Sequence, residues 1–285
     1  MSASTVSRSP SPRASSSTTV SRSPSPIRSP AIHAEEINLN LNPNRGRAVV
    51  PAEPYWKNKE QRNAMLTFFA RRMSERFHLV FGDCFVRQVL NIIPKENGTY
   101  RVLFAGQTNA AVVQEIKTCL EQPAVQMVGI RVNYHYAANK AHSILWVLNK
   151  VKKTIELYDP LGAESFITMI PDYRRIFKTI IKRNQWPILK YTFSAITTTN
   201  PARGLQAYEH DVPSCHDIGG FCETWTFYYA ELRARNVNES PKQFKLKMER
   251  RLATITAAGI NLGEYLKNII LHYLLDATPT TPTTT

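Results

Sequence analysis

Apolar residues recur along this chain with the spacings of helices and strands, beginning about fifty residues from its start. In residues 58–77 they lie on one face of a 3.6-residue period, which is typical of an amphipathic helix. This apolar stripe consists of Met65, Leu66, Phe69, Met73 and Phe77. The other segments that read as helical are 109–120, 165–184, 222–232, 241–256 and 262–275.

Short apolar segments between these helices predict β-strands. They are 85–93, 99–104, 125–136, 141–148, 154–159 and 188–196. The pair Asn97-Gly98 separates the first two strands and is typical of a tight hairpin turn. The polar segment 197–219 contains Pro and Gly and is expected to be a loop. Because strands and helices do not alternate regularly, the pattern predicts an α+β fold with a mixed central sheet flanked by helices.

The two ends of the chain lack this patterning. A Ser/Arg/Pro-rich segment that begins at Thr5 is repeated fourteen residues later, and its Ser-Pro pairs are candidate phosphorylation sites. Such a composition buries too little apolar surface to order itself. We therefore expect a disordered leader at 1–50, a folded domain at 51–276 and a disordered Thr/Pro tail at 277–285.

The chain is strongly basic, with 36 Lys and Arg against 22 Asp and Glu and a net charge of +14. The leader holds six Arg and two Glu, or +4, which leaves +10 for the rest. This charge suits nucleic acid, acidic protein partners or anionic membranes, and equally a merely basic protein. No apolar run is long enough for a membrane span, and four cysteines without a Cys-x-x-Cys pair predict reduced thiols. We expect an intracellular protein, nuclear or cytoplasmic, and leave its oligomeric state open.

One cysteine stands where a fold can make a nucleophile. Cys222 follows Gly219-Gly220 and opens a helical run in which Trp225, Tyr229 and Leu232 should face inward. Unpaired N–H groups and the positive end of the helix dipole stabilise a thiolate in the first turn. The alternative is a buried structural cysteine. A zinc site built from Cys215, His216 and Cys222 lacks regular spacing, so we predict neither a metal nor a cofactor.

A predicted hairpin upstream of Cys222 supplies a candidate base. A four-residue loop at 149–152 would pair residue 148 with 153, and on that register His142 lies opposite Asp159. Opposed side chains have Cβ atoms roughly 4.5–5.5 Å apart. A carboxylate at that distance can orient an imidazole and stabilise the imidazolium. The alternative is a surface contact at the margin of the sheet.

Taken together, these residues resemble the clan CE cysteine proteases. This group includes the proteases specific for SUMO and other ubiquitin-like proteins, together with the adenovirus protease. The resemblance lies in the order His142, Asp159, Cys222 and in the separation of seventeen positions between the first two. It also lies in the residues that flank Asp159 and Cys222. It covers about residues 140–236 and is closest to versions from large DNA viruses. It implies a papain-like or adenain-like architecture with His142 as general base, Asp159 as orienting acid and Cys222 as nucleophile.

The resemblance implies a thiol peptidase or isopeptidase that cleaves a protein substrate, either a viral precursor or a ubiquitin-like conjugate. A viral origin would place the protein in a host cell or virion. The chain departs from the family where Ser143 replaces a Trp after the His and where the usual Gln before the Cys is missing. Gln206, 47 residues after Asp159, becomes the candidate oxyanion donor, or else is an ordinary loop glutamine. Cys215 is the alternative nucleophile.

Two other functions fit the same residues. Acetyltransferases of bacterial effectors resemble clan CE and pass an acetyl group through the same kind of cysteine. An inactive relative could serve as a basic structural or nucleic-acid-binding protein, to which the net charge of +14 and the Ser-Arg leader would be suited. Labelling of Cys222 by a thiol-directed electrophile separates the enzyme classes from the inactive one.

Overall fold

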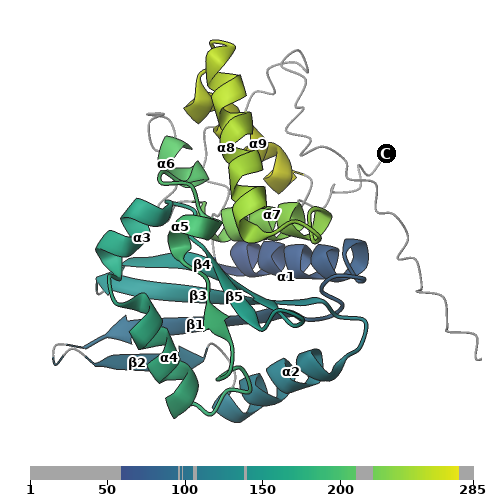
Figure 1. The fold of residues 1–285 in the computed structure, drawn as a ribbon, viewed down its shortest axis with the longest axis vertical. Coiled ribbons are helices and arrows are strands. Elements are labelled where there is room, and N and C mark those ends of the chain that lie inside the picture. The colour runs from purple at the N-terminus through teal and green to yellow at the C-terminus, as the bar shows by residue number, and fades with distance from the viewer. Residues whose placement is uncertain are drawn as a thin grey trace, which may run out of the picture. The chain divides into compact units, whose positions relative to one another are not determined.

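A mixed β-sheet with helices packed on both faces forms the described part of the chain (Figure 1). The computed structural model describes residues 59–95, 97, 99–104, 108–137, 140–209 and 221–275. The predicted leader at 1–50, the tail at 277–285 and Gly98 of the predicted turn lie outside these residues.

Among the described residues, six strands form one sheet in the order β2-β1-β3-β4-β5-β6. The strands are β1 Phe85–Pro94, β2 Tyr100–Phe104, β3 Met127–Ala137, β4 Lys140–Asn149, β5 Thr154–Tyr158 and β6 Thr192–Phe193. β1 pairs in parallel with β3, and β5 with β6, whereas the other neighbours are antiparallel. The mixed pairing, with helices that do not alternate regularly with strands, confirms the predicted α+β class.

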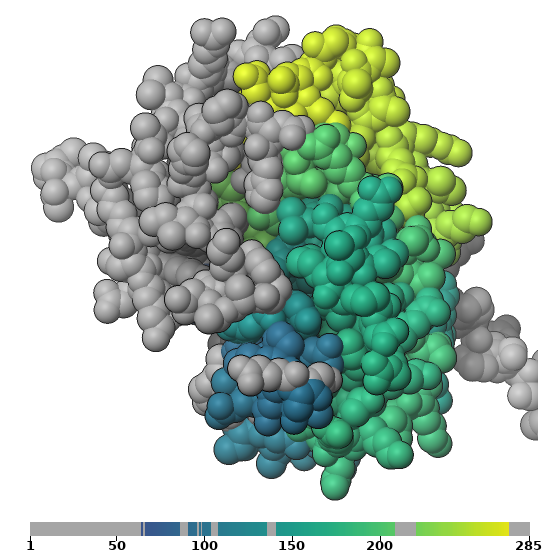
Figure 2. Space-filling model, turned by 90° about the vertical axis from the view of Figure 1, so that its left-hand side faces the viewer, coloured from purple at the N-terminus to yellow at the C-terminus, as the bar shows by residue number. Residues whose placement is uncertain are grey.

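The helices match most of the predicted ones closely. They are α1 Lys59–Arg76, α2 Asn109–Glu121, α3 Ala163–Met169, α4 Tyr173–Arg183, α5 Ile196–Thr199, α6 Leu205–Glu209, α7 Cys222–Arg235, α8 Pro241–Ala257 and α9 Leu262–Leu275. Figure 2 shows the face that carries the β1–β2 hairpin (blue) beside α3 and α4 (teal-green). No helix in the described residues is both long and apolar enough to cross a membrane.

Three of the predicted elements differ from the structure. The helix predicted at 165–184 is two helices, because Pro171 has no N–H to continue the helical hydrogen bonds. Of the strand predicted at 188–196 only Thr192–Phe193 pairs with β5, since the preceding residues form a turn that buries Ile188 and Tyr191 and leaves Leu189 exposed. The loop predicted at 197–219 contains the short helix α6 and the end of α5.

The sheet separates two apolar cores, and the alternation of its side chains decides which core each residue enters. Leu145 and Val147 on β4 join the core formed with α1, α7, α8 and α9. Ile144, Trp146 and Leu148 on the same strand join the core formed with α2, α3 and α4. Burial on both faces explains why β4 carries an almost unbroken apolar run instead of an alternating one.

Helix α7 is buried along nearly its whole length and not on one face only. The predicted inward residues Trp225, Tyr229 and Leu232 are buried, but so are charged residues on its other sides. Arg233 forms a two-pronged ion pair with Glu156 of β5, with N···O distances of 2.8 and 3.1 Å. The predicted inward face is therefore confirmed, and paired charges allow the polar sides of the helix to be buried as well.

Two further buried ion pairs fix α7 to its neighbours. Arg131 of β3 lies 3.1 Å from Glu223 in the first turn of α7. Arg72 of α1 lies 2.6 Å from Glu231, whose carboxylate also accepts a hydrogen bond from Tyr273 of α9 at 2.8 Å. Removing one partner of such a pair leaves a charge in a site that water does not reach. These contacts hold α7 against β3, β5, α1 and α9.

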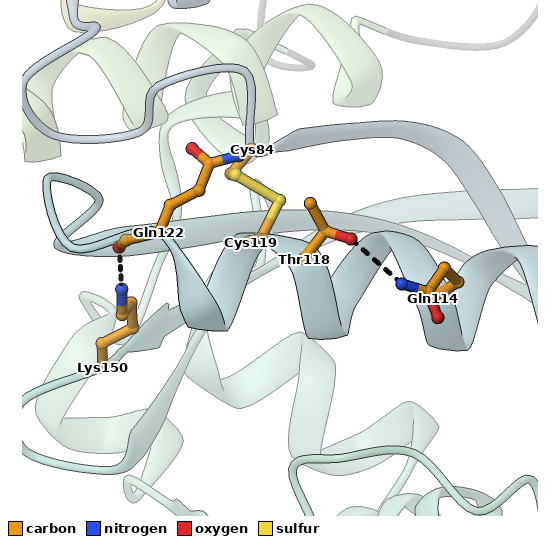
Figure 3. The surroundings of a disulfide bond; sticks show 6 residues. All are labelled: Cys84, Gln114, Thr118, Cys119, Gln122 and Lys150. Atoms are coloured by element: carbon orange, nitrogen blue, oxygen red, sulfur yellow. Dashed lines mark hydrogen bonds between the residues drawn. A yellow bond between two sulfur atoms is a disulfide. The ribbon is translucent and has the colours of Figure 1, made fainter.

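A disulfide joins Cys84, directly before β1, to Cys119 near the end of α2 (Figure 3). Their Cα atoms are 5.5 Å apart although 35 residues separate them in sequence. The same corner holds a hydrogen bond from Lys150 Nζ to the carbonyl oxygen of Gln122. The expectation that these cysteines are reduced is therefore wrong for this pair, because the sequence spacing carries no sign that the fold brings them together.

We predict that Glu156→Ala lowers the free energy of unfolding by about 3–5 kcal/mol, because it leaves Arg233 buried without its partner. Urea denaturation monitored by circular dichroism measures the change. The matched control is Glu75→Ala, which removes a carboxylate from an exposed pair with Arg71 whose side chains are 74% and 60% accessible. That change should cost about 0–1 kcal/mol. Equal losses in the two variants would contradict the assigned role of the Glu156–Arg233 pair.

Candidate active site

His142 and Asp159 meet at one end of the sheet. His142 is near the start of β4, and Asp159 directly follows the end of the antiparallel strand β5, so both lie at the same end. The Nε2 atom of His142 lies 2.7 Å from Oδ1 of Asp159. His142 is 5% exposed and Asp159 is fully buried. The contact between His142 and Asp159 is therefore buried, and it is not the surface contact that the sequence allowed as an alternative.

The pairing register that brings them together differs by two residues from the predicted one. Leu148 pairs with Ile155, so the loop of four residues is 150–153 and not 149–152. On this register Asp159 lies diagonally across from His142 instead of directly opposite. A slip of two residues leaves each side chain on the same face of the sheet, whereas a slip of one would reverse it. Diagonal neighbours remain within reach of long side chains, so the predicted contact forms despite the wrong register.

The carboxylate of Asp159 is fixed by its own turn. Its Oδ1 accepts a hydrogen bond from the backbone N–H of Leu161 at 2.7 Å, in addition to the contact with His142. The N–H of Gly162 donates to the carbonyl of Asp159 at 3.0 Å and closes the turn. Gly162 has a φ of 98°, which side chains disfavour. The turn Pro160-Leu161-Gly162 therefore ends the strand and also orients the carboxylate of Asp159 toward the ring of His142.

Asn200 holds the backbone on the other side of Asp159. Its Oδ1 accepts from the N–H of Asp159 at 2.8 Å, and its Nδ2 donates to the carbonyl of Leu157 at 2.6 Å. The hydroxyl of Thr199 donates to the same carbonyl at 2.6 Å. Asn200 and Thr199 are fully buried. The sequence analysis missed both residues, because they lie in a segment predicted to be a polar loop and no spacing connects them with Asp159.

The segment that leads to Gln206 is locked to the turn after Asp159. The N–H of Gly204 donates to the carbonyl of Leu161, and the N–H of Gln206 donates to that of Pro160, both at 2.9 Å. A Cβ added to Gly204 would lie 2.2 Å from the Pro160 carbonyl, so only glycine allows this approach. Gln206 is 3% exposed, and its Oε1 has no hydrogen-bond partner among the described residues. The structure thus brings Gln206 beside the acid.

Cys222 is the first residue of α7, as the sequence predicts, and is 5% exposed. It forms a side-chain hydrogen bond with His142. Because Nε2 of the ring is engaged by Asp159, Nδ1 is the nitrogen that remains for the thiol. The N-cap residue Phe221 offers no capping side chain, so first-turn N–H groups of α7 are not satisfied by a cap. A continuous chain of contacts therefore runs from Asp159 through His142 to Cys222.

The protonated ring of His142 is favoured in this setting. Burial is the largest single influence and lowers the pKa of His142, because it disfavours the charged ring. The charge of Asp159 and its hydrogen bond, with a contribution from Cys222, together outweigh burial and raise the pKa of His142 from 6.5 to about 10. Because this pKa lies above neutral pH, the His142 ring stays protonated once it has taken a proton from a neighbouring group.

The ion pair between Arg131 and Glu223 lies next to this centre along the chain. Glu223 follows Cys222 directly, and its carboxylate is compensated by Arg131 at 3.1 Å. A carboxylate in the first turn also interacts favourably with the helix dipole. The pair thus anchors the turn that carries the thiol to β3. The sequence analysis did not single out either residue, since nothing in the sequence links positions 92 residues apart.

Several predicted site features fall outside the described residues. They are Cys215, His216, Gly219 and Gly220. The glycine turn before Cys222 and the alternative nucleophile therefore stay predictions. Among the residues that the structure describes, no group of three or more His, Cys, Asp or Glu side chains is arranged to hold a metal ion.

A scan against models of known protein families gives no match to this chain, and a search of the curated proteins gives none either. The functional conclusion therefore depends on the chain's own residues. Those residues are the buried series Asp159, His142 and Cys222, brought to one end of the sheet by three separate segments.

Proposed function

We propose that this protein is a cysteine peptidase or isopeptidase with a papain-like or adenain-like arrangement of its catalytic groups. The observation that carries the proposal is the contact of His142 Nε2 with Asp159 at 2.7 Å together with the side-chain hydrogen bond between His142 and Cys222. A thiol at a helix start, a histidine and a buried carboxylate supply nucleophile, base and orienting group in the order that thiol catalysis requires.

The first step is the transfer of the thiol proton. Asp159 accepts a hydrogen bond from Nε2–H of His142 and so fixes the tautomer in which Nδ1 carries no proton and is free to face Cys222. Nδ1 takes the proton of the Cys222 thiol. The charge of Asp159 stabilises the resulting imidazolium, which is why the pKa of His142 is raised. The thiolate that remains lies at the positive end of the α7 dipole.

The thiolate then attacks the carbonyl of a protein substrate next to a glycine or another small residue. The tetrahedral oxyanion is stabilised by the N–H of Cys222 and by the side chain of Gln206, which we assign as a second donor. His142 gives its proton to the leaving amine, so that a thioester to Cys222 forms as the C–N bond breaks. Water activated by His142 hydrolyses the thioester and regenerates the thiol.

The position of the acid also supports this function over a purely structural role. A buried carboxylate next to a histidine costs desolvation energy unless several donors satisfy it. Asp159 receives Leu161 N–H and His142 on one oxygen, while its Oδ2 has no partner among the described residues. A buried carboxylate oxygen without a partner is uncommon in a purely structural position and is compatible with a catalytic one.

We predict that a peptide electrophile ending in glycine, such as a glycine vinyl sulfone, labels Cys222 in the full-length protein. Cys222→Ser should abolish labelling, and His142→Ala should slow it by about 10²–10⁴-fold, because the base is lost. Mass spectrometry of the digested protein locates the adduct. The matched control is Cys215→Ser, which should label at the wild-type rate. Unchanged labelling in Cys222→Ser, with the adduct on Cys215, would reject the assignment of the nucleophile.

We predict that Asp159→Asn lowers the pKa of His142 well below its wild-type value of about 10, because the charge that raises it is removed while the ring stays buried. NMR titration of the His142 ring measures this change. In the wild type, the pair stabilises the fold fully below pH 6.5, the ordinary pKa, and this contribution is lost as pH rises toward 10. The stability difference between wild type and variant should shrink over that range. A ring that titrates alike in both proteins would contradict the contact.

We predict that Asn200→Ala reduces kcat by about 10²-fold, because a small displacement of the Asp159 backbone misaligns the imidazole. Initial rates on a cleavable peptide measure the effect. Because Asn200 acts through Asp159, the pKa of His142 should fall in this variant too, while KM changes little. Thr199→Val is the comparison, since it removes a hydroxyl that bonds the Leu157 carbonyl and Asn200 Nδ2 but leaves the hydrogen bond between Asn200 Oδ1 and the Asp159 N–H. A loss of stability with normal kcat and an unchanged His142 pKa would show that Asn200 has only a structural role.

A further inference from the structure

A pocket of about 330 Å³ opens between β2 and α4. β2 is the edge strand of the sheet, three positions from β4, which carries His142 (Figure 1). Its apolar lining includes Val102 of β2 together with Ile176 and Ile180 of α4. The arginines Arg175 and Arg183 line it from the same helix. Thr99, Tyr100, Thr179 and Asn184 add polar groups to the lining, so the pocket combines apolar, polar and cationic side chains, and it lies outside the candidate active site.

The helix beside this pocket carries an unusual excess of positive charge. Its eleven residues contain five cations and no carboxylate. The cations are Arg174, Arg175, Lys178, Lys182 and Arg183, and all are exposed. Only Arg175 pairs with a carboxylate among the described residues, through Asp172 at 2.8 Å. Like charges four residues apart, such as Arg174 with Lys178, destabilise a helix. The two cations in the last turn are favourable for the helix dipole, but this does not explain the other three.

Helix α8 shows how the same chain neutralises cations elsewhere. It also carries several Lys and Arg residues, but Lys245 pairs with Glu249 at 3.0 Å and Lys247 with Glu239 at 3.1 Å. On α4, residues 175, 179 and 183 form a row that borders the pocket. The cations at 174, 178 and 182 form a second row of the same helix, on the side of the first row away from the pocket. The cationic face of α4 and the pocket therefore form one continuous surface.

We propose that this surface binds an acidic peptide segment of a protein partner, with one apolar side chain inserted in the pocket. The carboxylates of the segment would lie on Arg175, Arg183 and the outer cations, as acidic motifs do on arginine clusters. The three apolar side chains favour a peptide over nucleic acid, because a phosphodiester chain offers no aliphatic side chain to pack against them. The volume is at the lower end of ligand sites and leaves room for an apolar side chain. This binding goes beyond the proposed peptidase activity and does not depend on it.

The test uses the full-length protein and a fluorescein-labelled heptapeptide of six glutamates with a leucine at its centre. Fluorescence anisotropy gives the dissociation constant at about 50 and 200 mM salt. Arg175→Glu/Arg183→Glu should weaken binding by about tenfold or more, since attraction becomes repulsion at the pocket. Replacing the central leucine by serine should weaken binding of the wild-type protein several-fold. Higher salt should weaken it as well, because the charges are exposed.

The matched control is Lys242→Glu/Arg250→Glu on α8, which changes the net charge by the same amount at two exposed positions away from the pocket. It should retain near wild-type affinity, and circular dichroism should show that both double variants are folded. Equal weakening by the two variants would show an effect of net charge alone and would overturn the proposal. So would equal affinity for the leucine and serine peptides. A single-stranded oligonucleotide of equal charge that binds more tightly, with the same sensitivity at Arg175 and Arg183, would replace the peptide by nucleic acid.

Discussion

The burial of helix α7 is the constraint on which the rest of the structure depends. When a helix is buried on several sides, each charged residue on those sides needs an oppositely charged partner, because water does not reach it. Arg233 finds Glu156 on β5, and Glu223 finds Arg131 on β3. These pairs fix both the rotation and the axial position of the helix against the sheet. Cys222 begins α7, so the same contacts determine where the thiol lies.

The acid of the site is held by a second, separate polar network. Asp159 has no freedom to turn away from His142, because Leu161 and Asn200 fix its carboxylate and its backbone. The close approach at Gly204 joins this turn to the segment that carries Gln206. In the proposed enzyme, base, acid and oxyanion donor would thus be positioned by contacts that are buried and shared. Preorganisation of this kind lets the groups act without rearrangement during the reaction.

The two proposals place chemistry and recognition on different parts of the sheet. The proposed triad lies at one end of β4 and β5, whereas the β2–α4 pocket lies at the edge strand β2. Their charges also differ in character. The cations at α7 are buried and compensated, while those of α4 are exposed and mostly without a carboxylate partner among the described residues. Unpaired exposed cations are available to another molecule, and compensated buried ones are not.

The sequence by itself determined the α+β class and most helix boundaries, because apolar periodicity is a local property. The hairpin length and a family resemblance together pointed to His142, Asp159 and Cys222 as a candidate set. The predicted register was wrong, yet the contact survived because a slip of two residues keeps side chains on their face. Only the tertiary structure decided the disulfide Cys84–Cys119, the charge partners of α7 and the role of Asn200. Those contacts join segments tens of residues apart, and their energies come from burial and geometry that no local pattern records.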